Sequence, residues 1–166
     1  MQELTILIAE YGLALVFANV LLEQLGIPVP ATPTLFVTGA IAAGGTTSAL
    51  DVFAVAILAC LLANVLWFGA GKRYGQRIVS TLCRVSLAPN SCIRQSENLF
   101  RRWGSGALIL GKFVPGLSCV APLVAGVMHL RFRSFLIVNT IGAAIWIGAA
   151  IGAGLLLHST IGLPRP

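Results

Sequence analysis

The chain has 166 residues and a formal net charge of +6; 57% of its residues are hydrophobic and only 10% are charged. A soluble domain carries about 25% charged residues, so the composition excludes an ordinary soluble protein and indicates an integral membrane protein of one domain. The basic residues flank long apolar runs, which argues against nucleic acid as a partner and fits the excess of Lys and Arg on the cytoplasmic side of membrane proteins.

The first apolar run, residues 4–22, predicts a helix that contains one carboxylate, Glu10. The run is long enough to cross a membrane, but a charge in its first half makes it a marginal span. Two interpretations stay open: the helix crosses the membrane, or it lies in the interface. The N-terminus lacks the basic segment and the A-x-A site of a cleaved signal peptide.

A proline-rich stretch, EQLGIPVPATP, follows at residues 23–33. Residues 24–50 carry no charge, but three prolines within six residues forbid one continuous helix. We expect an extended turn and then a short helix over residues 34–43, ended by two glycines. Residues 23–48 are therefore predicted to enter and leave the membrane on one side, as a re-entrant hairpin.

Residues 52–71 predict a transmembrane helix, with Asp51 as its N-cap. Its one strongly polar group is Asn64, and Trp67 lies near its end, as interfacial aromatic residues do. Gly71 and Gly75 form a GxxxG pattern, which occurs at close helix contacts and also by chance.

The loop at residues 72–104 is basic: seven Lys or Arg and one acid fall between Lys72 and Arg102. We expect it on the cytoplasmic side, with a short amphipathic helix after Ser91 lying on the anionic membrane face. The alternative is a solvated positive loop that only fixes the orientation of the protein.

A second broken segment, residues 105–128, contains GKFVPGLSCVAPLVAG. Lys112 places a charge near its start, and Pro115 and Pro122 each remove a backbone donor. Freed backbone groups in hydrocarbon must be satisfied by protein or by a water-lined cavity, so we expect a second re-entrant hairpin. A charge at membrane depth indicates a functional site. The alternative is a kinked helix whose lysine reaches the surface.

A basic turn at residues 129–133, also expected to be cytoplasmic, leads to a second transmembrane helix over residues 134–157. This helix contains Asn139 and a GxxxG pattern at Gly148 and Gly152. The order predicts an all-α integral membrane fold of two inverted halves, each a re-entrant proline-broken hairpin followed by a transmembrane helix. Paired interrupted segments of this kind indicate a binding site near the membrane centre.

Four motifs stand in a fixed order between about residues 16 and 154. They are Glu23 with Gly26, Pro28 and Pro30; WFGAGKRYG at residues 67–75; Gly111, Lys112, Phe113, Pro115 and Gly116 with Ala125 and Gly126; and Phe135, Asn139, Gly142 and Trp146. Together they resemble the DedA family of bacterial membrane proteins, which carries the VTT (SNARE-associated) domain. The resemblance gives a single domain over residues 1–166, with a core of about residues 16–157.

The chain departs from the family pattern at several positions. Thr32 stands where many members have an acid, Asn64 where many have Asp, Lys112 replaces the usual Arg, and Ser118 stands where a second Arg is common. These changes resemble a subgroup with K-F-x-P-G-L-S. Members usually continue with another C-terminal helix, so we expect either a short member or a truncated one.

The resemblance implies a flippase or scramblase in the bacterial inner membrane. Its expected partners are membrane lipids with a phosphate headgroup, such as polyprenyl phosphate or a phospholipid, and a proton-linked step and an oligomer are compatible with it. Lys112 would receive the phosphate as a point charge, and Glu23 would balance Lys112 and take up a proton when lipid binds. The candidate substrate or ion site comprises Glu23, Lys112, Pro28, Pro30, Thr32, Phe113, Pro115, Gly116, Ser118, Asn64 and Asn139.

Three other interpretations are considered: a transporter of a small ion or solute, a purely structural role for the charged pair, and an enzyme. A proton-coupled transporter of a small ion or solute could use the same Glu23 and Lys112, and a purely structural pair could fix how two hairpins dock. An enzyme is not expected, because His129 and His158 are isolated and no nucleophile with a base is visible. The four cysteines show no CxxC spacing, so no metal or cofactor is expected.

Overall fold

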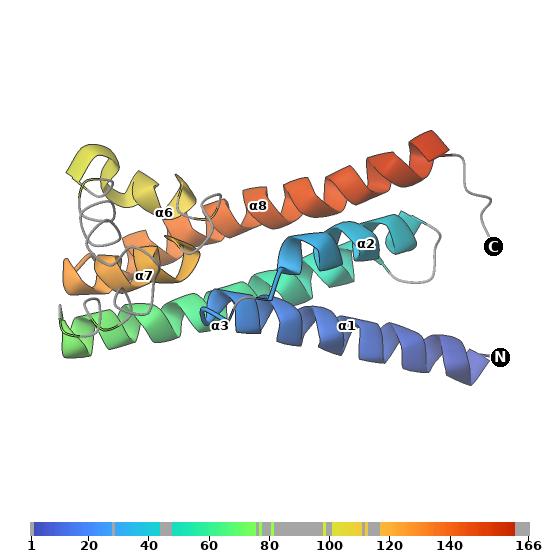
Figure 1. Ribbon diagram of the computed structural model, residues 1–166, viewed down its shortest axis with the longest axis horizontal. Coiled ribbons are helices and arrows are strands. Elements are labelled where there is room, and N and C mark those ends of the chain that lie inside the picture. The colour runs from blue at the N-terminus through green and yellow to red at the C-terminus, as the bar shows by residue number, and fades with distance from the viewer. Residues whose placement is uncertain are drawn as a thin grey trace. The chain divides into compact units, whose positions relative to one another are not determined.

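The computed structural model of the protein describes residues 2–27, 29–43, 48–75, 77, 81, 98, 101–110, 112 and 117–161. These residues are helical apart from short turns, and they contain no strand. Figure 1 shows the elements in chain order: α1 Gln2–Gln24, α2 Ala31–Ala43, α3 Ala49–Tyr74, η1 Gly104–Gly106, α6 Ala107–Leu110, α7 Leu117–Val127 and α8 Phe132–Ile161. The predicted all-α class is therefore confirmed for the described part of the chain.

Two of the described helices, α3 and α8, are long and apolar enough to cross a membrane. Each offers 26 residues, Ala49–Tyr74 and Phe132–Leu157, with mean hydropathies of 2.4 and 2.0. At 1.5 Å per residue such helices exceed the hydrocarbon thickness of about 30 Å. They contain the two predicted transmembrane segments, residues 52–71 and 134–157.

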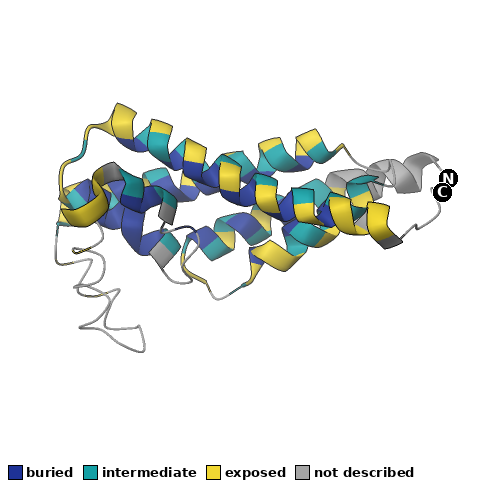
Figure 2. Ribbon diagram, turned by 90° about the horizontal axis from the view of Figure 1, so that it is seen from above, coloured by how far each residue is buried: buried dark blue, intermediate teal, exposed yellow. Residues whose placement is uncertain are grey.

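Both long helices expose apolar side chains in a stripe at helical spacing. The exposed residues are Leu58, Leu62 and Leu66 on α3 and Ile137, Ile141 and Ile145 on α8. Figure 2 shows buried and exposed residues alternating along these helices. A soluble protein seldom leaves so many large apolar side chains exposed in line, whereas a lipid-facing surface requires them.

The start of α3 differs from the prediction, because Ser48 rather than Asp51 is the N-cap. The Ser48 hydroxyl accepts a hydrogen bond from the Leu50 N–H at 3.3 Å, and the Ser48 carbonyl accepts one from the Asp51 N–H at 3.1 Å. The helix begins at Ala49, which places Asp51 inside its first turn. A carboxylate there interacts favourably with the helix dipole.

The chain forms two compact units. Unit 1 comprises Met1–Glu23, Ile27–Cys60 and Ala144–Pro166; unit 2 comprises Gln24–Gly26 and Leu61–Ala143. The division falls within α3 and within α8, so each of these helices contributes one part to each unit.

After α1 the chain reverses and continues into the short helix α2, which belongs to unit 1. The reversal begins at Gly26, whose φ of 97° suits glycine, and the Ile27 N–H bonds the Leu22 carbonyl at 3.0 Å in a Schellman arrangement. Pro33 lies in the first turn of α2, where the missing N–H has no helical partner to lose. Helix α2 therefore begins three residues earlier than predicted and ends at Ala43, as expected.

Helix α2 and the last part of α8 touch through their backbones, also within unit 1. A Cβ atom on Gly39 would lie 2.6 Å from the Ile151 carbonyl oxygen, and one on Gly154 would lie 2.1 Å from the Phe36 carbonyl oxygen. Each glycine thus faces the carbonyl that lies three residues before the other glycine. Only glycine permits this approach, which small residues commonly provide between membrane helices.

Unit 2 contains the same arrangement between α7 and the last part of α3. A Cβ atom on Gly71 would lie 2.1 Å from the Leu123 carbonyl oxygen, and one on Gly126 would lie 2.2 Å from the Phe68 carbonyl oxygen. The Gly71 part of the predicted GxxxG contact is therefore correct, but its partner is Gly126. Gly75 has a φ of 60° and stands just after the end of α3.

The core of unit 2 surrounds α7 and the start of α8. The ring of Phe68 on α3 stacks on that of Phe135 on α8, with centroids 4.3 Å apart. Pro122, which was expected to interrupt its segment, lies inside α7 and does not end that helix. Most of the predicted amphipathic helix after Ser91 lies outside the described residues, but residues 98 and 101–103, which are described, are helical. Residues 113–116 of the second broken segment also lie outside the described residues.

Candidate functional site

A buried cation, Lys112, is the centre of the candidate site in unit 2. Its side chain is 7% exposed, and its Nζ donates a hydrogen bond to Oε1 of Gln24 at 3.3 Å. The backbone N–H of Lys112 bonds the Ile109 carbonyl at 3.2 Å, which places the residue in a turn just after α6. A buried ammonium group is tolerated only when hydrogen-bonding partners replace its water.

Gln24, the last residue of α1, is itself held in place by its neighbours. Its side chain is 2% exposed, and its carbonyl oxygen accepts a hydrogen bond from Nε1 of Trp67 on α3 at 3.1 Å. Two residues later, Gly26 lies close to α7, where an added Cβ would be 3.7 Å from Sγ of Cys119. The backbone that carries the Gln24 amide is therefore anchored to α3 and passes close to α7.

Sequence reasoning missed Gln24 and selected its neighbour Glu23. Successive helix residues point about 100° apart, so the side chains of Glu23 and Gln24 leave α1 in different directions. Glu23 is half-buried and belongs to unit 1, while Gln24 and Lys112 both belong to unit 2. The predicted approach of Glu23 to Lys112 stays a prediction. One sequence feature could have indicated Gln24. It is an uncharged amide at the end of an apolar run, and such an amide needs a hydrogen-bonding partner when it is buried.

The two predicted asparagines, Asn64 and Asn139, meet inside unit 2. Both are fully buried, and Nδ2 of Asn64 on α3 donates to Oδ1 of Asn139 on α8 at 3.3 Å. Nδ2 of Asn139 has no acceptor within the described part of the chain. A buried donor without an acceptor costs about 1–3 kcal/mol, so this amide is available to a water or a ligand oxygen.

The remaining predicted site residues have varied surroundings. Pro30 and Thr32 are exposed in unit 1, and Ser118 is half-buried in the first turn of α7 in unit 2. The predicted positions outside the described residues are Pro28, Phe113, Pro115 and Gly116.

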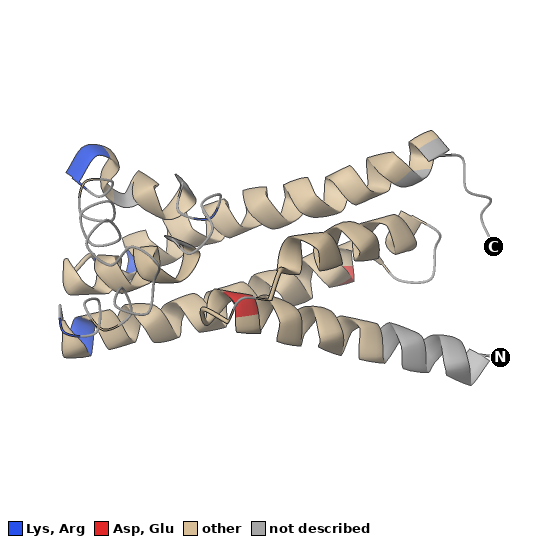
Figure 3. Ribbon diagram, viewed as in Figure 1, with Lys and Arg blue, Asp and Glu red and all other residues tan. Residues whose placement is uncertain are grey.

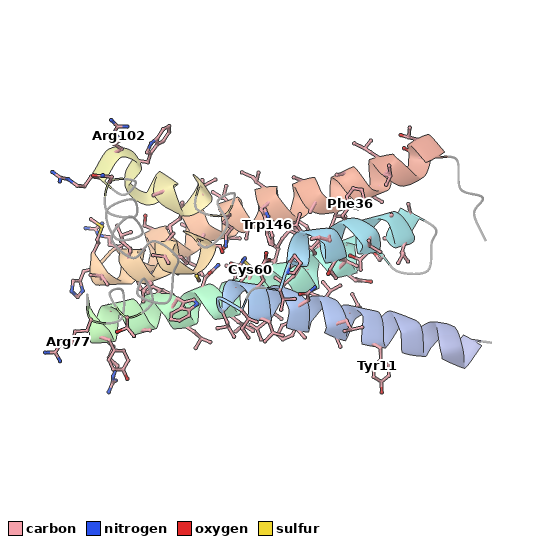
Figure 4. The ribbon with its side chains drawn as sticks, in the orientation of Figure 1. Tyr11, Phe36, Cys60, Arg77, Arg102 and Trp146 are labelled. Atoms are coloured by element: carbon pink, nitrogen blue, oxygen red, sulfur yellow. The ribbon has the colours of Figure 1, made fainter. Side chains whose placement is uncertain are left out.

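Lys112 differs in burial from the other basic residues that the structure describes. Figure 3 shows how few charged residues the described helices carry. The other described Lys and Arg residues are all exposed; they are Lys72, Arg73, Arg77, Arg101, Arg102, Arg131 and Arg133. Figure 4 shows the side chains of Arg77 and Arg102 directed away from the helices. Lys112 is therefore the buried exception among the basic residues that the structure describes.

Two apolar helices of spanning length, apolar stripes on their surfaces and a buried cation define a helical membrane protein. A family model described as the VTT domain matches residues 29–156, more than half of the chain. The protein belongs to this family, the DedA family of membrane proteins, as the sequence motifs indicated.

Several relatives are similar over most of the chain. The Escherichia coli (strain K12) protein named Protein DedA is 30% identical over 150 residues, covering 85% of this chain and 68% of its own. A Synechocystis protein named Uncharacterized membrane protein slr0232 is 26% identical over 161 residues, covering 97% and 74%. A Staphylococcus aureus protein named Undecaprenyl phosphate transporter A is 22% identical over 166 residues, covering 98% and 82%. No solved structure matches.

Proposed function

We propose that the protein transports a phosphate-bearing lipid across the bacterial inner membrane and that Lys112 receives the phosphate. The observation that carries this proposal is the burial of the Lys112 ammonium group, which is 7% exposed and bonded to a neutral amide oxygen. An ionised phosphate satisfies both the charge and the hydrogen bonds of such a group, because charge-assisted bonds are the stronger kind.

Two considerations support a polyprenyl phosphate as the substrate: the name of one relative and the chemistry of the headgroup. The Staphylococcus aureus relative is named for undecaprenyl phosphate transport. Polyprenyl phosphate has one phosphate monoester on a long apolar tail, so its headgroup suits a single buried cation while its tail remains in lipid. A phospholipid offers the same phosphate chemistry with a less negative headgroup.

The architecture proposed for this transport has two inverted halves, each with a re-entrant hairpin. The short helices α2 and α7 have 13 and 11 residues, fewer than the roughly 20 that a spanning helix needs. Each pairs with the end of a long helix through two glycines in reciprocal positions. Pro28 and Pro115 each precede the glycine of the short helix by eleven residues. This repetition supports two halves of common design.

In the proposed mechanism, Glu23 and Lys112 share one polar cavity near the membrane centre. Glu23 balances Lys112 before lipid enters, and the phosphate then replaces the carboxylate, which takes up a proton as it leaves the cation. This exchange would couple lipid movement to protons. A charge left alone at membrane depth costs about 2.5–3.5 kcal/mol on insertion scales, so one partner must always accompany Lys112.

The proposed topology places the basic segments, residues 72–102 and 129–133, on the cytoplasmic side of a multi-pass protein. Cysteine labelling from each side of the membrane tests this placement. Cys83 and Cys92 should react from the cytoplasmic side, and labelling only from outside would overturn the topology.

The functional proposal is tested with Glu23→Gln, Lys112→Ala and the double swap Glu23→Lys with Lys112→Glu. Each variant is scored for membrane insertion and for movement of polyprenyl phosphate in vesicles. We expect both single variants to insert and to lose transport, and the swap to restore folding without transport. Single variants that insert normally and transport at the parent rate would refute the roles of both residues. Full transport by the swap would reduce the pair to a docking device.

A further inference from the structure

Asn19 is a polar residue of α1, in unit 1, that the proposed mechanism does not use. It is the only strongly polar residue between Tyr11 and Leu22, and its Nδ2 donates a hydrogen bond to the hydroxyl of Thr34 on α2. Its amide oxygen, Oδ1, is buried and accepts no hydrogen bond within the described part of the chain. Buried polar atoms without a partner are uncommon in folded proteins, so this oxygen calls for an explanation.

We propose that Oδ1 of Asn19 accepts a hydrogen bond from the Glu23 carboxyl group when that group takes up its proton. Asn19 is then a positioning residue, which stabilises the neutral form of Glu23 and helps to set the pH at which that form appears. This inference rests on the proposed function, in which Glu23 is protonated as the phosphate takes its place beside Lys112. It adds the acceptor that the new O–H group requires.

Helix α1 brings the two side chains to one face. Asn19 and Glu23 are four residues apart in α1, and residues at this spacing are neighbours on a helix surface. The Cα–Cβ bonds of a helix tilt toward its N-terminus, so the Glu23 side chain leans back over the turn that carries Asn19. Both residues belong to unit 1, and Glu23 is half-buried. The helix geometry therefore suits a hydrogen bond between the carboxyl group and the amide.

Thr34 determines which end of the Asn19 amide is left for Glu23. Because Nδ2 donates to the Thr34 hydroxyl, the carbonyl end remains. An ionised carboxylate only accepts hydrogen bonds, so it gains nothing from a second acceptor beside it. A protonated carboxyl group has one O–H donor, which Oδ1 can accept. The arrangement therefore favours the neutral carboxyl group over the ionised one.

Few other titratable groups accompany Glu23 in unit 1. Among the side chains that the structure describes there, they are Tyr11 and Asp51, which are exposed, and Cys60, which is buried. The described Lys and Arg residues all belong to unit 2. The cation that the proposed function pairs with Glu23 is therefore Lys112, and Asn19 acts on the carboxyl group from its own helix.

The proton matches this lone oxygen better than a metal ion does. A hard cation such as Mg²⁺ or Ca²⁺ needs about six oxygen ligands, whereas one proton on a carboxyl group needs one acceptor. In the proposed step, one proton passes from water to the Glu23 carboxylate as the phosphate displaces it. The proton returns to water when the lipid leaves, and no other covalent bond changes.

The test compares the full-length protein with Asn19→Leu, which keeps a similar size and removes the acceptor, and with the control Thr38→Val. The Thr38 hydroxyl bonds the Thr34 carbonyl of its own helix at 2.8 Å, so its loss leaves the Asn19 contact in place. The readout is the infrared band of the protonated Glu23 carboxyl group, followed against pH in vesicles that contain polyprenyl phosphate. The band is identified by its absence in Glu23→Gln, and transport of fluorescent polyprenyl phosphate is measured over the same pH range.

We expect the pH midpoint of the Glu23 band to fall by about one unit in Asn19→Leu, a tenfold change in proton concentration, as one lost hydrogen bond predicts. The sign follows because the neutral form loses its acceptor and needs more protons to form. The pH profile of transport should move with the band, and Thr38→Val should keep the parent midpoint. An unchanged midpoint in Asn19→Leu, or an equal shift in Thr38→Val, overturns the inference. A higher midpoint also overturns it, because the amide would then donate to the ionised carboxylate.

The outcomes separate this inference from the function on which it rests. Parent protein that moves no polyprenyl phosphate refutes the proposed function, and the infrared midpoints still decide the role of Asn19. Active parent protein whose midpoint equals that of Asn19→Leu overturns the inference alone. If Asn19→Leu does not fold, Asn19→Ala replaces it with the same expected shift. A midpoint that depends on Na⁺ at constant pH would assign the oxygen to a metal ion and would overturn the inference.

Discussion

Replacing Gly71 by alanine is expected to destabilise unit 2, because the new methyl group meets the backbone of α7. Its Cβ would lie 2.1 Å from the carbonyl oxygen of Leu123 and 3.0 Å from the carbonyl carbon. Ordinary contacts begin near 3.4 Å, so α3 and α7 must separate by roughly 1 Å, at an overpacking cost of about 1–3 kcal/mol. Alanine recovers up to about 1 kcal/mol through its higher helix propensity, which leaves a net loss of about 1–2 kcal/mol.

The same helix provides the matched control, Gly69→Ala. A Cβ on Gly69 meets no described atom within 4 Å, so this variant gains helix propensity without a clash. Thermal unfolding of the detergent-solubilised protein, followed by tryptophan fluorescence, compares the two. Unit 1 repeats the experiment with Gly154→Ala, whose Cβ would lie 2.1 Å from a carbonyl oxygen, and the control Gly152→Ala. If Gly71→Ala unfolds at or above the temperature of Gly69→Ala, the close crossing of α3 and α7 is wrong.

Three further variants probe other contacts by the same unfolding measurement. Asn64→Leu should cost about 1–3 kcal/mol because it leaves Asn139 buried without its partner, and adding Asn139→Leu should recover part of this loss; additive losses would contradict the contact. Trp67→Phe should cost about 0.5–1.5 kcal/mol through the lost hydrogen bond to the end of α1, and no loss would argue against that anchor. Ser48→Ala should cost about 1 kcal/mol as a lost N-cap, whereas Asp51→Ala should cost less; the reverse order would restore the cap to Asp51.

The two long helices could be predicted from sequence because length and hydropathy suffice to identify them. Their ends could not, since the capping oxygen of Ser48 and the extension of α8 to Ile161 depend on local contacts. The α1–α2 turn was also predictable, because proline and glycine act through the backbone at their own positions. The start of α2 was predicted three residues too late, because a proline in the first turn of a helix and a proline in the turn before it give the same sequence pattern.

Contacts between distant residues were less accessible to sequence reasoning. The GxxxG pattern at Gly148 and Gly152 does not include Gly154, which makes the close approach to α2. Spacing within one helix does not reveal which glycine faces a partner. The bond between Gln24 and Lys112 spans 88 residues, and no local pattern distinguishes Gln24 from the more conspicuous Glu23. Asn64 and Asn139 could each be proposed as site residues from the sequence, but only the structure shows that they form a hydrogen bond with each other.

The central claim is that this membrane protein moves a phosphate-bearing lipid. The most direct measurement reconstitutes the purified full chain in vesicles and follows the accessibility of a labelled polyprenyl phosphate headgroup to a membrane-impermeant quencher, with entrapped small solutes monitored in parallel. The account predicts that headgroups in the inner leaflet become accessible faster than in protein-free vesicles while the solutes remain trapped. Solute flux without any change in headgroup accessibility would contradict it and would indicate a small-solute transporter instead.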